Sequence, residues 1–201
     1  MLILEGPDRI GKSTAARQIL KLDPSWHSVH MTKPKDDFAH FEDYMKLLQP
    51  KTVYDRFHLG ALVYGNLTTE ELQRTDRELL AMTARAIRFL GSQVVVLYSS
   101  CDTWLSAHVQ ETSEEELYEF DTILRVNRVF RWLATMGVVH QASLFGTILV
   151  DVAHDVAVEG WPSEAQLQLW MEWAHKRQAS VAAPEETFTN INAKSFEFHM
   201  P

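Results

Sequence analysis

The sequence predicts an α/β fold, a five-stranded parallel sheet flanked by helices, on two observations. Short apolar runs alternate along the chain with segments that begin like helices, which is typical of repeated βαβ units. A glycine loop directly follows the first apolar run and directly precedes a helical segment. With 201 residues, 46% of them hydrophobic, the chain is long enough to bury one sizeable core.

The apolar runs supply the expected strands. In chain order these are Leu2–Glu5, Ser28–Met31, Thr52–Asp55, Gln93–Tyr98 and Thr147–Val152.

Helix start signals lie between these runs. A helix should begin at Lys12, directly after the glycine loop. Three further starts have the pattern of capping boxes, in which a hydroxyl and an acid or amide satisfy backbone N–H groups that the first helical turn leaves unpaired. These boxes are Thr68-x-x-Glu71, Ser113-x-x-Glu116 and Ser163-x-x-Gln166.

The final helix carries Leu167, Leu169, Trp170 and Trp173, so part of its surface should be buried. Beyond about residue 178 the pattern fades. We expect one domain over residues 1–178, with residues 179–201 as a C-terminal tail to which the sequence assigns no role.

Charge and cysteine content narrow the class of protein. The 19 basic and 27 acidic residues give a net charge of −8, and there is no basic run of five residues, so stable nucleic acid binding is not expected. Cys101 is the only cysteine, which excludes an intramolecular disulfide and fits a reducing cytoplasm; we expect it to be a small buried residue. No stretch has the roughly 18 apolar residues of a membrane span, and because the first strand is predicted to begin at residue 2 we expect no signal peptide. We expect a cytoplasmic protein without membrane contact.

The glycine loop has the spacing Gly6-x-x-x-x-Gly11-Lys12-Ser13 of a Walker A motif, between a strand and a helix. Such a loop turns successive N–H groups toward phosphate oxygens, and the helix N-terminus adds partial positive charge. Lys12 should bridge the β- and γ-phosphates and Ser13 should hold Mg²⁺. The predicted ATP and Mg²⁺ contacts are Gly6, Pro7, Asp8, Arg9, Ile10, Gly11, Lys12, Ser13 and Thr14.

The absence of several other sequence motifs narrows the class of P-loop protein. The Asn-Lys-x-Asp motif of GTPases is missing, and the chain is short for an assembly ATPase. His-Glu-x-x-His, Cys-x-x-Cys and Gly-x-Ser-x-Gly are missing as well, so the metal we expect is the Mg²⁺ that accompanies the nucleotide. A small phosphotransferase fits best.

Two Asp-Arg pairs are candidates for its chemistry. Asp8-Arg9 lies inside the loop, where the Arg9 guanidinium could stabilise the negative charge that spreads over the transferred phosphoryl group. The alternative is a solvent-facing arginine paired with an acid. Asp55-Arg56 ends the third strand, at the edge where ligands of such sheets bind. Asp55 could hold a magnesium-bound water or orient the acceptor, and Arg56 could bind an acceptor phosphate; a surface salt bridge is the alternative.

The segments "LEGPDRIGKST", "DRFHLGALVYG" and "QVVVLYSS" together resemble the thymidylate kinase family of P-loop nucleoside monophosphate kinases, in its branch with Asp-Arg inside the P-loop. The resemblance implies the P-loop kinase fold with a short mobile lid, here at approximately 101–120. It also implies transfer of the ATP γ-phosphoryl group to dTMP, with Mg²⁺.

The same resemblance implies roles for individual residues. Arg9 would serve catalysis together with Lys12 and Asp55, Asp8 would approach the deoxyribose hydroxyl, and Arg56 would bind the monophosphate of the acceptor. Tyr64 would place its ring against the sugar. Residues 108–120 contain no Lys or Arg, in agreement with a catalytic arginine in the loop instead of the lid.

The acceptor side departs from the family pattern. Only about thirty residues separate the first helix from Asp55. Phe38 and Phe41 lie in that interval and could stack on the base, or could be core residues. Gly60 and Ala61 stand where the family commonly has serine and glutamine, which leaves base choice open, dGMP included.

Three other functions stay open: a deoxynucleoside kinase, a kinase of a hydroxymethylated base in DNA, and a non-catalytic nucleotide-dependent module. The sequence also leaves the oligomeric state open, a homodimer included. Arg125, Arg128 and Arg131 fall three apart, and we expect a solvated or salt-bridged helix face, with phosphate contact as the alternative.

Overall fold

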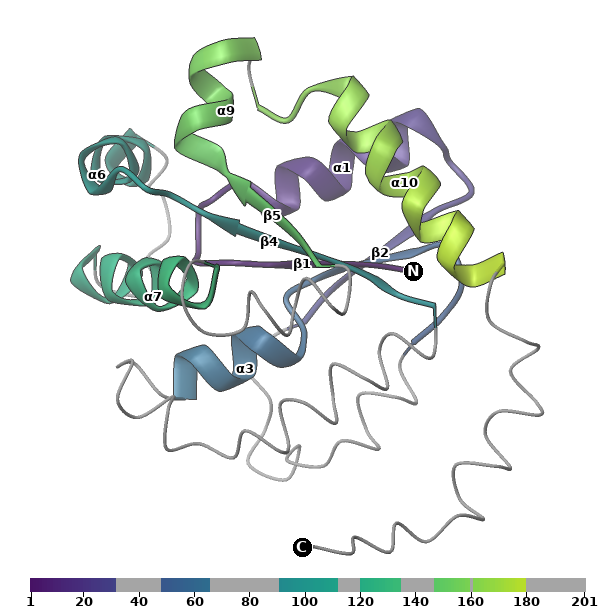
Figure 1. Cartoon of the computed structure of the whole chain (residues 1–201), viewed down its shortest axis with the longest axis horizontal. Helices are drawn as coiled ribbons and strands as arrows, with labels where there is room; N and C mark the ends of the chain where they lie inside the picture. The colour runs from purple at the N-terminus through teal and green to yellow at the C-terminus, as the bar shows by residue number, and fades with distance from the viewer. Residues whose placement is uncertain (32–47, 66–90, 112–119, 135–146, 160, 180–201) are drawn as a thin grey trace, which may run out of the picture.

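The structure, a computed structural model, describes residues 1–31, 48–65, 91–111, 120–134, 147–159 and 161–179. Its five strands form one parallel sheet in the order β2-β3-β1-β4-β5 (Figure 1). The strands are β1 (Leu2–Glu5), β2 (His27–His30), β3 (Thr52–Asp55), β4 (Gln93–Tyr98) and β5 (Ile148–Asp151). The helices are α1 (Lys12–Leu22), α3 (His58–Gly65), α6 (Asp102–Glu111), α7 (Phe120–Trp132), α9 (Val152–Glu159) and α10 (Glu164–Ala179).

The predicted five-stranded parallel sheet is confirmed, and β1, β3 and β4 have the predicted bounds. β2 begins and ends one residue earlier than expected because its register on β3 pairs His27 with Thr52 and His30 with Asp55. β5 is one residue shorter than expected at each end.

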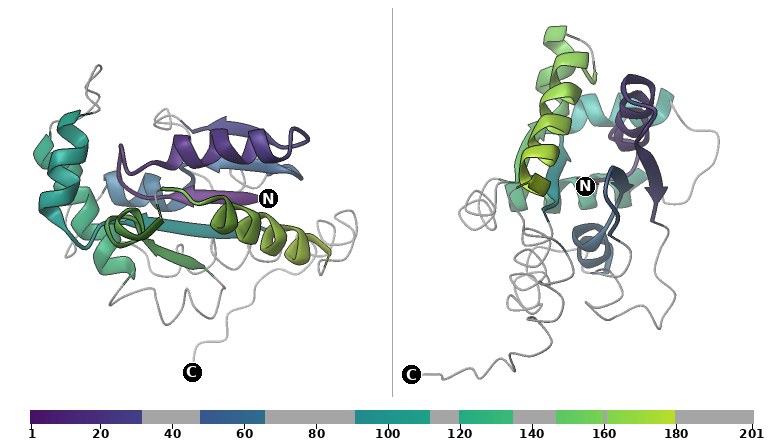
Figure 2. Two further views of the ribbon diagram at one scale, coloured as in Figure 1. Left: turned by 90° about the horizontal axis from the view of Figure 1, so that it is seen from above. Right: turned by 90° about the vertical axis from the view of Figure 1, so that its right-hand side faces the viewer.

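Helices cover both faces of the sheet. α1, α9 and α10 lie on one face and α3 and α7 on the other (Figure 1). Seen from above, α1 and α10 run side by side over the sheet (Figure 2). Because side chains alternate along a strand, Val95 and Leu97 of β4 face α1 and α10, while Val96 faces α3 and α7.

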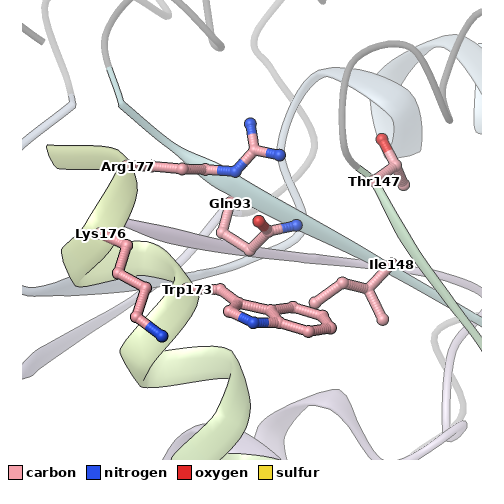
Figure 3. A pocket seen from close by; sticks show the side chains of 6 residues that line it. All are labelled: Gln93, Thr147, Ile148, Trp173, Lys176 and Arg177. Carbon is pink, nitrogen blue, oxygen red and sulfur yellow. The ribbon is translucent and has the colours of Figure 1, made fainter. Parts of the chain in front are cut away.

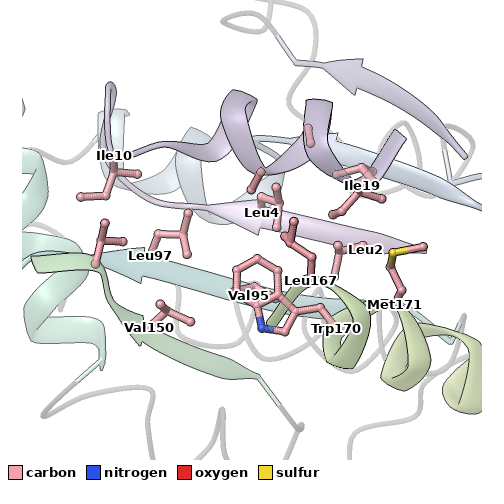
Figure 4. Packing of buried hydrophobic residues seen from close by; sticks show 14 of the residues in the cluster. Leu2, Leu4, Ile10, Ile19, Val95, Leu97, Val150, Leu167, Trp170 and Met171 are labelled. Carbon is pink, nitrogen blue, oxygen red and sulfur yellow. The ribbon is translucent and has the colours of Figure 1, made fainter. Parts of the chain in front are cut away.

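The larger core lies under α1 and α10. It joins Leu2 and Leu4 of β1 to Leu167, Trp170 and other apolar side chains (Figure 4). Every residue of β1 is buried, as expected for the central strand of a sheet covered on both faces. The strand that leads into the Walker loop is therefore buried along its whole length.

Two helix starts follow the prediction. α1 begins at Lys12, and α10 begins with the predicted capping box, where Gln166 N–H donates to Ser163 Oγ (3.3 Å) and Ser163 N–H donates to Gln166 Oε1 (3.2 Å). On α10, Leu167 and Trp170 are buried, whereas Leu169 and Trp173 are exposed. The other two predicted boxes, at 68–71 and 113–116, lie outside the described residues, as does the tail from residue 180.

The expectation for Cys101 is wrong. Its side chain is exposed, because the residue lies after the end of β4 and directly before α6, where Trp104 N–H donates to its sulfur (3.4 Å). Within the described ranges, no helix has both the length and the apolar character needed to cross a membrane.

Candidate active site

The candidate site lies at the carboxyl edge of the central strand β1 and its neighbour β3. These strands are neighbours, with Leu4 paired to Asp55, so the Walker loop after β1 and Arg56 after β3 leave the sheet side by side. Arg56 N–H donates to the carbonyl of Leu4 (2.9 Å). The sheet thus brings together the two motifs that the sequence singled out.

The backbone of the loop requires its two glycines. Gly6 has φ 149°, and a Cβ there would lie 2.5 Å from the carbonyl oxygen of Leu97. Gly11 has φ 99° and ends the loop at the start of α1. A Cβ on Gly11 would lie 2.3 Å from Nε1 of Trp161, whose indole covers this glycine.

Lys12 is buried at the centre of the site. Its side chain is 4% exposed, and its Nζ donates to the carbonyls of Gly6 (3.0 Å) and Pro7. Burial lowers the pKa of Lys12, and the negative charges of Asp55 and Asp8 oppose that shift. The ammonium group is thus held inside the curve of the loop.

Asp8, Arg56 and Tyr64 form one network across the loop. Arg56 Nη2 donates to Asp8 Oδ1, and the Arg56 guanidinium lies 5.7 Å from the centre of the Tyr64 ring. Asp8 N–H donates to the Tyr64 hydroxyl (2.9 Å), and Lys12 Nζ lies 4.0 Å from Asp8 Oδ1. Burial and the charge of Asp8 raise the pKa of Tyr64. Four of the residues predicted from sequence therefore lie together.

Ser13 and Asp55 form a second pair. The Ser13 hydroxyl donates to Asp55 Oδ2, and His30 Nδ1 lies 3.1 Å from the same oxygen. Asp55 Oδ1 is buried without a hydrogen-bond partner. A hydroxyl and a carboxylate with a spare buried oxygen are hard oxygen ligands of the kind that Mg²⁺ takes, so these two residues fit a nucleotide-bound Mg²⁺. Among the described side chains, no group of three or more His, Cys, Asp or Glu could hold a metal.

Arg9 contacts α6. Its Nη1 donates to the carbonyl of Val109 (3.1 Å), in the last turn of α6, where helical carbonyls have no partner within the helix. Both Arg9 (φ 63°) and Arg56 (φ 68°) have left-handed backbone conformations, which are uncommon for residues other than glycine and concentrate at functional sites.

Glu5 is a site residue that the sequence analysis missed. The carboxylate is fully buried and accepts N–H groups from Leu59 (2.9 Å) and Gly60 (3.0 Å) at the start of α3. Burial raises the pKa of Glu5 to about 7, while these N–H groups and the charge of Lys12 hold the pKa down. The sequence feature that could have indicated this role is a single acidic residue at the end of an otherwise apolar strand.

His30 and Trp161 were missed as well. His30 contacts Asp55 because β2 and β3 are neighbours in register. Trp161 packs against the larger core and lies directly over Gly11. Phe38 and Phe41, the predicted base contacts, lie outside the described residues.

The arginines of α7 form the predicted salt-bridged face. Arg128 and Arg131 contact Asp102 at 3.2 and 3.4 Å, and Arg125 is exposed. These contacts favour the salt-bridged reading of the stripe over phosphate binding.

A cavity of about 370 Å³ lies elsewhere, at the amino-terminal edge of β4 and β5 against α10 (Figure 3). It is lined by Gln93, Thr147, Ile148, Trp173, Lys176 and Arg177. Since the Walker loop leaves the opposite edge of the same sheet, this cavity is not part of the candidate site.

Comparison with known proteins bears on the fold. No family model and no curated protein sequence matches the chain. Among solved structures, YorR protein of Bacillus subtilis in complex with phosphorylated GDP matches at 19% identity and a TM-score of 0.57, over 90% of this chain and 99% of that one. Polyphosphate Kinase 2 of Arthrobacter aurescens TC1 matches at 16% identity and a TM-score of 0.55, over 96% and 75%.

A third structure, deoxyadenosine kinase of M. mycoides with bound dATP, matches at 17% identity over 85% of this chain and 96% of that one. Its TM-score of 0.47 is too low to support a conclusion. The two better matches, together with the sheet order and the loop, show that this chain has the P-loop kinase fold.

Proposed function

We propose that this protein is a kinase that transfers the γ-phosphoryl group of ATP to a deoxynucleoside 5′-monophosphate, with dTMP as the first acceptor to test. One observation carries the proposal. Arg56, the candidate acceptor cation, is bound through Asp8 to the same loop that holds Lys12. A donor phosphate on the loop and an acceptor phosphate on Arg56 would then be held by one network.

The roles of the residues follow from their chemistry. Lys12 and the loop N–H groups would bind the β- and γ-phosphates, and Arg56 would bind the acceptor phosphate bidentately. Arg9 would exchange the Val109 carbonyl for an oxygen of the transferred group. Catalysis would consist of positioning and charge stabilisation, without a covalent intermediate.

Ser13 and Asp55 are the residues that would hold Mg²⁺. When bound, Mg²⁺ would neutralise charge on the phosphate oxygens. Asp55 would offer two oxygens for this purpose, Oδ2, which accepts the Ser13 hydroxyl, and the unpartnered Oδ1.

A second candidate is a deoxynucleoside kinase, whose acceptor is a 5′-hydroxyl. The same unpartnered Asp55 Oδ1 favours it, because a hydroxyl acceptor needs a nearby carboxylate to receive its hydrogen bond. A monophosphate acceptor has no such requirement.

The deciding experiment is product analysis with Mg·ATP and a panel of acceptors. The panel contains the four deoxynucleoside monophosphates, the four matching nucleosides and a hydroxymethylated duplex DNA. We expect turnover of dTMP, with dGMP as the next base to compare. Turnover of nucleosides or DNA alone would refute the monophosphate assignment and leave the P-loop kinase fold unaffected.

A further inference from the structure

Glu5 is a buried carboxylate that the proposed phosphoryl transfer does not use. It is the last residue of β1, directly before Gly6, and its exposed fraction is 0%. A buried carboxylate is costly unless hydrogen bonds compensate for the lost water. The position of Glu5 therefore depends on the groups that satisfy it.

Those groups belong to the start of α3 and to Phe57, whose backbone N–H also hydrogen-bonds to Glu5 directly before the helix. Leu59 and Gly60 N–H donate to Glu5 Oε1 (2.9 Å) and Oε2 (3.0 Å), one to each carboxylate oxygen. The first N–H groups of a helix have no acceptor within the helix, and a negative charge there is favoured by the helix dipole. Glu5 thus caps the start of α3 from β1, accepting the free N–H groups that an N-cap side chain usually accepts at the start of its own helix.

The other end of α3 is also attached to the Walker loop. Tyr64, in the last turn of the helix, accepts the N–H of Asp8 at 2.9 Å. Arg56 comes two residues before α3, and its own N–H is bound to Leu4. The segment that carries Arg56 is therefore fixed on both sides by contacts to β1 and the loop.

We propose that Glu5 is the positioning residue that couples the phosphate loop to Arg56 through the start of α3. Loss of its hydrogen bonds would let α3 shift, and the guanidinium of Arg56 would move with it. The proposal rests on the proposed function only in assigning Arg56 to the acceptor.

A substitution at Gly60, in α3, can disturb the same contact without changing Glu5. A Cβ on Gly60 would lie 3.1 Å from Glu5 Oε2 and 3.6 Å from Cβ of Arg56. The first distance is tighter than ordinary van der Waals contact, so Gly60→Ala would push the carboxylate away from the helix. Since alanine also favours helix, this variant disturbs the contact without weakening α3 itself.

The test compares Glu5→Gln and Gly60→Ala with Thr52→Val. Thr52 is a buried residue at the opposite end of β3, where its hydroxyl donates to the Pro50 carbonyl (3.1 Å), so its variant controls for loss of a buried hydrogen bond. For Glu5→Gln we expect the KM for dTMP to rise about tenfold and the KM for ATP to change by less than about threefold. Gly60→Ala should show the same split, smaller in size, and Thr52→Val should show none.

Hydrogen exchange supplies a readout that needs no activity. Amides of residues 58–62 should exchange faster in Glu5→Gln and Gly60→Ala than in the wild type, and at the wild-type rate in Thr52→Val. If Glu5→Gln fails to fold, the KM comparison and the hydrogen exchange are both made with Gly60→Ala alone. Equal changes in the two KM values, or unchanged exchange at the start of α3, would overturn the proposal. If the wild type does not turn over dTMP, the proposed function fails, and exchange still decides whether Glu5 holds α3.

Discussion

The contact between Gly11 and Trp161 makes a quantitative prediction for Gly11→Ala. An alanine at φ 99° would have an unfavourable backbone conformation, at about 1–2 kcal/mol. Its Cβ would also lie 2.3 Å from Nε1 and 2.9 Å from Cδ1 of Trp161, and such overpacking costs about 1–3 kcal/mol. After subtracting about 0.5–1 kcal/mol for the lower entropy of the unfolded chain, we expect a loss of about 1–4 kcal/mol in unfolding free energy.

Only the steric part of this loss depends on the indole. In a Trp161→Ala background the backbone part should remain and the steric part should disappear, so the two substitutions should be non-additive by about 1–3 kcal/mol. Urea unfolding followed by far-UV circular dichroism, without nucleotide, measures all four proteins of this cycle.

Gly91 provides the matched control. It also has a positive φ, of 73°, but its added Cβ would meet the backbone of Gln178 and Arg177 instead of Trp161. Gly91→Ala should therefore destabilise by the same amount with and without Trp161. Additive behaviour of Gly11→Ala and Trp161→Ala would refute the packing of this indole on the Walker loop.

Three further predictions concern Lys12, Tyr64 and Glu5. Lys12→Ala should lower turnover on the order of 10²–10³-fold while circular dichroism shows a retained fold, because the cation at the transferred phosphates is lost; activity within tenfold of the wild type would contradict its role. Tyr64→Phe removes the acceptor of Asp8 N–H and should lower the unfolding free energy by about 1 kcal/mol in urea titrations, whereas an unchanged midpoint would argue against that bond. The pKa of Glu5 is raised by burial from 4.5 to about 7, so its contribution to stability is complete below pH 4.5 and is lost as pH rises through 7. This loss amounts to about 3 kcal/mol and should be absent in Glu5→Gln, as unfolding at pH 5 and pH 8 would show; equal pH dependence in both proteins would contradict it.

Much of the candidate site was predictable because it is encoded in contiguous residues. The Walker spacing determines where the backbone bends and where Lys12 begins a helix, and both lie where the sequence predicts them. Asp55 ends a strand of the predicted bounds, and Arg56 follows it directly. Tyr64 came from the resemblance to thymidylate kinases, and the structure brings its hydroxyl to Asp8.

What sequence reasoning missed depends on contacts between distant segments. Apolar patterns indicate which segments are strands and say nothing of which strands are neighbours. The strand order places His30 beside Asp55, and the crossing of α3 over the end of β1 supplies the partners of Glu5. Cys101 was wrongly predicted to be buried because residue type indicates average burial, while its place at the start of α6 decides its exposure.

The sequence by itself determined the parallel α/β class, the Walker A loop and the side chains that we propose for phosphoryl transfer, because local spacing controls backbone turns and helix starts. Only the tertiary structure decided how those groups are held. Arg56 is bound to Asp8, Arg9 to α6, and α3 to a buried glutamate, since burial makes each unsatisfied charge or N–H group costly and so selects its partner.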